Sequence, residues 1–116
     1  MPEKLVRDQP GARIQAEGGQ IRVALPHEMP VLLARKLVEE AQEVLAEIER
    51  AAKGTSVSEH ISYWSNMIEE LGDVETVLVH LRRVTRISHV SVRDRQVQKN
   101  NEAGGFDKRL VWIKDA

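Results

Sequence analysis

The sequence predicts an all-α protein, and three observations indicate this fold class. Apolar residues recur every three or four positions over two long stretches, as they do on the buried face of an α-helix. Proline or glycine stands close to the ends of the helical patterns. The alternation of polar and apolar residues that is typical of a strand is found in one short run, residues 20–25.

In chain order, residues 1–30 are expected to be irregular or weakly structured. Pro10-Gly11 marks a turn or a short helix start. Residues 12–17 suffice for one or two helical turns, which Gly18-Gly19 would end. Residues 20–25 would then form a short strand or an extended arm.

The first long helix is predicted at about residues 29–52, with Pro26 and Pro30 around its start and Lys53-Gly54 at its end. Glu40 borders its apolar stripe and Glu43 lies on the polar side of that border. The expected core stripe consists of Leu33, Leu37, Ala41, Val44 and Ile48.

A second long helix is predicted to run to about Arg86. Ser56 and Glu59 fit a capping box, and residues 57–66 are either a separate short helix or its first turns. Gly72 lies inside the periodic pattern, which indicates close approach of another backbone or a ligand. Trp64 is expected in the core or in a subunit contact. The expected core stripe consists of Met67, Leu71, Val74, Leu78 and Leu81, widened by Val77 and Val84.

Ser91 is expected to cap a last helix that Gly104-Gly105 ends. The tail, residues 106–113, would be extended, with Trp112 packing it down.

The composition of the chain limits the classes of protein to which it can belong. The 116 residues suit a single domain, 1–116, and 41% hydrophobic content supports a core. With so few aromatic residues and two amphipathic helices, we expect an oligomer to bury what one chain leaves exposed. The net charge of −1 argues against a nucleic-acid partner, and the absence of cysteine excludes disulfides and thiolate metal sites. No signal peptide or membrane span is visible, so a cytoplasmic protein without a membrane partner is expected.

Acidic residues interrupt both apolar faces. Glu70 precedes Val77 by seven residues and so projects from nearly the same side, and Asp73 lies one turn further on. The first helix carries a second pair with the same spacing, Glu40 and Glu43. If the faces pack together, four carboxylates converge, which a hard divalent cation such as Mg²⁺ would compensate. The alternative is that these acids are ordinary solvated charges on helix surfaces.

Basic residues gather near both ends of the chain. Lys4 and Arg7 stand beside Asp8 at the start, and Lys99-Asn100 precede Lys108-Arg109 at the end. Cations beside a metal-filled acidic centre would suit a polyphosphate. Solvated charge at flexible ends is the alternative. The four histidines show no metal-ligand spacing.

Four motifs in this order resemble the all-α nucleoside triphosphate pyrophosphohydrolases, the MazG-like group that includes phosphoribosyl-ATP pyrophosphohydrolase. Glu39-Glu40-Ala41-Gln42-Glu43 is similar to the family's E-E-x-x-E helix, and Glu70-Leu71-Gly72-Asp73 to its E-x-x-D helix. The start K-L-V-R-D at residues 4–8 resembles that of one branch. Residues 99–108 resemble the K-N-x-x-R-G-G-F ending of that branch, with Ala103 where the family often has Arg.

The resemblance implies an all-α, four-helix-bundle-type MazG-like fold with short extended segments at both ends. It implies Mg²⁺, with Mn²⁺ as a substitute, and cleavage of a nucleoside triphosphate between its α and β phosphates. It also implies a homodimer or homotetramer. Alternatives are phosphoribosyl-ATP hydrolysis in histidine synthesis, and a non-catalytic helical dimer that binds metal or nucleotide. The implied metal ligands are Glu40, Glu43, Glu70 and Asp73. Substrate contacts are expected from Lys4, Arg7, Asp8, Lys99, Asn100 and Lys108. Glu39 or Glu43 would orient or deprotonate the attacking water.

Overall fold

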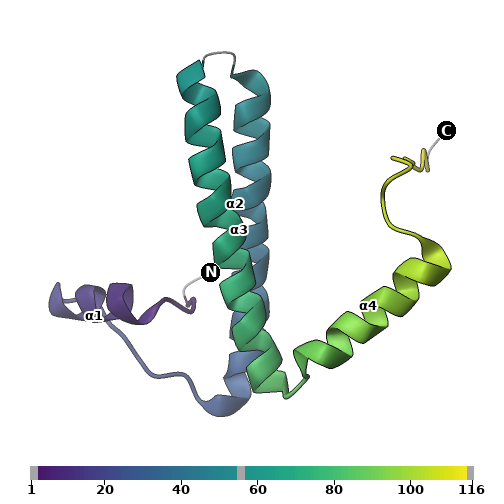
Figure 1. The fold of residues 1–116 in the computed structure, drawn as a ribbon. Helices are drawn as coiled ribbons and strands as arrows, with labels where there is room; N and C mark the ends of the chain where they lie inside the picture. The colour runs from purple at the N-terminus through teal and green to yellow at the C-terminus, as the bar shows by residue number, and fades with distance from the viewer. Residues whose placement is uncertain (1–2, 55–56, 115–116) are drawn as a thin grey trace. The chain divides into compact units, whose positions relative to one another are not determined.

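A computed structural model describes residues 3–54 and 57–114, and within these residues all regular structure is helical (Figure 1). The all-α fold class is therefore confirmed. The helices are α1 (Asp8–Ala16), the 3-10 turn η1 (Pro26–Glu28), α2 (Met29–Lys53), α3 (Val57–Thr85) and α4 (His89–Ala103). The chain divides into two compact units, Met1–Thr85 and Arg86–Ala116. That these units form a single domain stays a prediction. Among the described residues, no helix is apolar and long enough to span a membrane.

The helices α2 and α3 lie side by side as a hairpin and form the packed centre of the first unit (Figure 1). Leu33 from α2 and Met67 and Val77 from α3 are the buried apolar side chains of this hairpin, and each is at most 9% exposed. Glu40 is buried at 7% exposure in the same interface. The described residues of this unit supply two helices of a bundle, so a four-helix bundle stays a prediction.

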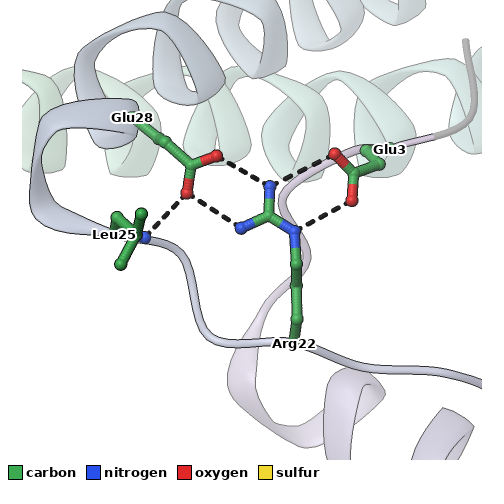
Figure 2. A network of polar contacts seen from close by, with 4 residues as sticks. All are labelled: Glu3, Arg22, Leu25 and Glu28. Atoms are coloured by element: carbon green, nitrogen blue, oxygen red, sulfur yellow. Dashed lines mark hydrogen bonds and ion pairs between the residues drawn. The ribbon is translucent and has the colours of Figure 1, made fainter.

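A guanidinium group fastens the N-terminal segment to the start of the hairpin. Arg22 donates to Glu3 on one side, at 2.9 and 3.2 Å, and to Glu28 on the other, at 2.8 and 2.9 Å (Figure 2). The Leu25 N–H also donates to Glu28. Hydrogen bonds from Arg22 and Leu25 lower the pKa of Glu28 to about 2. The Arg22 side chain thus links Glu3, near the start of the described chain, to Glu28, which directly precedes α2. These charge-assisted hydrogen bonds lie on the solvent-exposed surface.

The N-terminal region is more helical than expected at one point and less regular at another. The helix α1 begins at Asp8 rather than near Ala12, and its C-terminal turn is followed by Gly18 at φ 90°, a conformation that glycine adopts without strain. Residues 20–25 have no partner strand in the described structure, so the extended-arm alternative is the correct one.

The structure bears on three other local predictions. Residues 57–66 are the first turns of α3, while the proposed cap at Ser56 lies outside the described residues. A Cβ built on Gly72 would meet no described atom within 4 Å outside the backbone of its own helix, so another part of the described backbone does not approach it closely, and approach of a ligand stays a prediction. Trp64 is 69% exposed, so the expected core packing is wrong within this chain, and a subunit contact stays a prediction.

In the second unit, Ser88 rather than Ser91 caps α4, because the Ser88 hydroxyl accepts from the Ser91 N–H at 3.1 Å. Gly104 ends the helix at φ 78°, as predicted. Trp112 is 79% exposed and contacts the Lys114 ammonium at 5.3 Å, so it does not pack the tail down against the described residues of its unit.

Candidate active site

Three carboxylates converge where α2 and α3 face each other. One oxygen each from Glu40, Glu43 and Glu70 lies within 4.8 Å of the others. Glu40 and Glu43 are one turn apart on α2, so both reach the same side of the helix, and Glu70 approaches from α3. We call these three residues the acid cluster.

Two oxygens of the acid cluster have no hydrogen-bond partner in the part of the chain that the structure describes. Glu40 Oε2 and Glu70 Oε2 are both buried without a hydrogen bond. A buried acceptor left unpaired costs free energy, and a buried carboxylate costs more. The arrangement is therefore unfavourable for the hairpin alone and is suited to a positively charged ligand.

Burial and the neighbouring carboxyl groups raise the pKa of Glu40 and the pKa of Glu43. Desolvation raises the pKa of Glu40, and the charge and hydrogen bond of Glu43 raise it further, against the lowering effect of Lys36. Desolvation also raises the pKa of Glu43, followed by its hydrogen bond with Glu70. Both shifts would be reversed by a cation that attracts the ionised carboxylates.

Asp73, the fourth predicted ligand, is paired with a cation. Arg7 Nη2 lies 2.6 Å from Asp73 Oδ1, which brings the N-terminal segment to α3. The charge of Asp73 still contributes to the raised pKa of Glu40, so it acts on the acid cluster although it is not one of the three converging groups. Any ligand that uses Asp73 would have to compete with Arg7.

Glu39 lies between two ammonium groups. Lys4 Nζ and Lys36 Nζ each donate to Glu39 Oε1 at 3.2 Å. Desolvation acts to raise the pKa of Glu39, but the hydrogen bonds from the two lysines outweigh it and the pKa is lowered. Glu39 is thus an ionised carboxylate next to the acid cluster.

The remaining predicted substrate residues are placed less closely. Asp8 is the first residue of α1 and, with Arg7, lines the cavity described below. Lys99 and Asn100 lie in α4, and Lys108 lies in the following tail, all within the second unit. Their roles stay predictions.

Sequence reasoning missed Lys36. Its side chain is 18% exposed and lies 3.5 Å from Glu40 Oε1 as well as touching Glu39. The signal was present, because Lys36 precedes Glu40 by four residues and such pairs are neighbours on a helix. Asn66 of α3 carries no comparable signal in the sequence, and its amide donates to Glu47 of α2 at 3.1 Å, which links the two helices.

The acid cluster fits a divalent metal ion. Its donors are carboxylate oxygens only, which Mg²⁺ and Mn²⁺ favour, and its two unpaired oxygens are buried where a cation would be shielded from water. Without histidine or thiolate ligands, the donor set does not match a typical zinc site.

A comparison with protein families agrees with this geometry. The family model of the MazG nucleotide pyrophosphohydrolase domain matches residues 29–103, more than half of the chain. The chain belongs to the MazG nucleotide pyrophosphohydrolase family. No curated protein matches it, and no solved structure does. The match begins with α2 and ends with α4, so this MazG domain includes the acid cluster, while the N-terminal segment that carries Lys4 and Arg7 lies before the matched region.

Proposed function

We propose that this MazG domain hydrolyses a nucleoside triphosphate between the α and β phosphates, releasing a nucleoside monophosphate and pyrophosphate, with Mg²⁺ as its cofactor. The observation that carries the proposal is the acid cluster with its two buried, unpaired carboxylate oxygens. Family membership supports phosphoanhydride hydrolysis, and the surrounding lysine and arginine side chains suit a chain of phosphates.

Glu40, Glu43 and Glu70 would hold the metal ion, joined by Asp73 once Arg7 leaves it. When bound, Mg²⁺ would neutralise phosphate charge and make the α phosphorus more electrophilic. Arg7 would then be free to bind a phosphate oxygen.

Glu39 and Glu43 are the two groups proposed to orient the attacking water and accept its proton. Because a carboxylate that binds metal has fewer lone pairs to offer, Glu39 is the better base if Glu43 is a ligand. Lys4 and Lys36 hold Glu39, and a triphosphate would compete for both ammonium groups. The water oxygen would form a bond to the α phosphorus while the bond to the bridging oxygen breaks, and pyrophosphate would leave.

The test is a pyrophosphate-release assay on the common ribo- and deoxyribonucleoside triphosphates and on phosphoribosyl-ATP, with Mg²⁺ or Mn²⁺. We expect release from a nucleoside triphosphate and dependence on the metal. Preference for phosphoribosyl-ATP would instead favour a role in histidine synthesis. Magnesium binding by calorimetry without turnover of any nucleotide would favour a non-catalytic binding module.

Substitution of the proposed ligands tests the mechanism. Glu40→Gln and Asp73→Asn should abolish turnover because each removes a negative charge from the metal site, while the helical circular-dichroism signal stays. Glu69→Gln is the matched control, since Glu69 is exposed and adjacent to Glu70. Full activity in both ligand variants would remove these acids from the mechanism.

The proposed oligomer, a homodimer or homotetramer, is supported by apolar surface that one chain leaves uncovered on α2 and α3. Ile61, Trp64, Ile68 and Leu71 are between 49% and 71% exposed and recur at steps of three and four along α3. An apolar stripe of this kind is typical of a helix–helix interface.

A further inference from the structure

A cavity of about 300 Å³ adjoins the acid cluster. Residues 5–8 of the N-terminal segment form one wall, and both long helices form the others, with Leu33 from α2 and Val77 from α3 at its apolar side. Leu33 and Val77 are buried, so this part of the cavity belongs to the packed centre of the hairpin.

Two residues connect the cavity to the acid cluster. Glu40 lines the cavity and contributes an oxygen to the acid cluster, and Lys36 lines the cavity while contacting Glu39 and Glu40. A ligand with phosphates at the acid cluster would therefore have this cavity as the adjoining space for its uncharged part.

The side chains that line the cavity indicate what kind of chemical group would bind there. Apolar side chains with a few polar groups are typical of sites for small organic ligands, and a volume near 300 Å³ is at the lower end of their range. Thr76 and His80 from α3 supply polar groups, and Arg7, Asp8, Lys36 and Glu40 are the charged residues of the lining. The Thr76 hydroxyl donates to the Gly72 carbonyl oxygen at 3.0 Å, so it presents lone pairs rather than its proton to the cavity.

We propose that this cavity binds the nucleoside part of the substrate, with Leu33 and Val77 against the flat face of the base and with Thr76 and His80 selecting its polar edge or the sugar. This inference rests on the proposed function and deepens it, because it assigns nucleotide selectivity to the junction of the N-terminal segment with α2 and α3. Thr76 would favour a ligand that offers a hydrogen-bond donor.

The first test separates nucleoside from phosphate recognition. His80→Ala removes a polar group from an exposed position, and Leu5→Trp fills the cavity from the N-terminal segment. We expect each to raise the KM for the preferred nucleotide about tenfold, the effect of losing one hydrogen bond or its equivalent in contact. The inhibition constant of inorganic tripolyphosphate, which has no nucleoside, should stay within about twofold.

The matched control is His60→Ala, since His60 is exposed on the same helix and does not line the cavity. It should change neither constant. An unchanged KM in both His80→Ala and Leu5→Trp overturns the assignment, and so does an equal rise in the tripolyphosphate inhibition constant.

The second test does not depend on turnover. A nucleoside monophosphate is titrated into the metal-free protein and its variants, with binding followed by chemical-shift changes in the NMR spectrum. Weaker binding to Leu5→Trp than to His60→Ala supports the cavity even if no triphosphate is hydrolysed, an outcome in which only the proposed function fails. Equal binding to the two variants rejects the cavity assignment.

Discussion

At the scale of single residues, the acid cluster links stability to pH and to metal. Glu40 has a raised pKa, so the folded chain binds more protons than the unfolded chain where the carboxyl titrates. The free energy of unfolding should therefore fall as pH rises above 4.5, the ordinary value for this acid, and level off once pH exceeds the raised pKa. Glu28 acts in the opposite sense, since its contribution is lost only as pH falls from 4.5 towards about 2.

Glu40→Gln should consequently stabilise the metal-free protein at pH 7 and raise its Tm, because the variant has no carboxylate to ionise at this buried position. The gain should shrink towards pH 4.5, where wild-type Glu40 is increasingly protonated. Thermal unfolding with a chelator and then with added Mg²⁺ measures both effects. Magnesium should raise the Tm of the wild type and have a smaller effect on the variant. A variant that is less stable than the wild type at pH 7 without metal would contradict the argument.

Residue spacing predicted that four acids converge, because acids one turn apart share a helix side, and three of them do, whereas Asp73 pairs with Arg7. The basic partners of the acids could not be predicted in this way. Nothing in the sequence shows that Arg7, more than sixty residues before Asp73, would pair with it, or that Lys4 would reach Glu39. These contacts depend on how the N-terminal segment folds back, which the Arg22 bonds to Glu3 and Glu28 help to determine.

At the scale of helices, periodicity predicted the first long helix, and the end of the second, within about one residue. It left the start of the second helix open and placed the buried faces of both imperfectly. Leu71 was assigned to the core of α3 and is 49% exposed, and Ile48 of α2 is 43% exposed. An apolar repeat defines an arc of the helix, and the facing helix decides which edge of that arc is covered. Here the covered edge is the one that carries Glu40 and Glu70, so the acids lie deeper than the sequence indicated.

The cap of α4 gives a prediction at this scale. Ser88→Ala removes the acceptor of the Ser91 N–H and should cost the helix about 1 kcal/mol. Ser91→Ala loses only the hydroxyl–hydroxyl contact with Ser88 and should cost a few tenths. Hydrogen exchange of the first-turn amides of α4 measures the difference. Equal exchange in the two variants would show that Ser88 is not the cap.

At the scale of the whole molecule, the first unit buries little apolar surface for its length. Only three of its described apolar side chains are buried, whereas α2 carries a second apolar row that is largely open to solvent. Val31, Val38 and Leu45 recur every seven residues in that row and are 53–58% exposed. Apolar residues that repeat every seven positions favour packing against another helix. The sequence indicated an oligomer for the same reason, and the open rows now specify the faces on which it would form.

We therefore expect Leu45→Glu to convert the proposed oligomer to monomers, because it places a charge in the middle of the open row on α2, where burial against a second copy would be costly. Ala46→Glu is the matched control. It adds the same charge one residue further on, about a quarter of a turn away towards the polar face. Light scattering coupled to size-exclusion chromatography measures the mass of each. Monomeric wild type, or equal loss of assembly in both variants, would contradict an interface along this row.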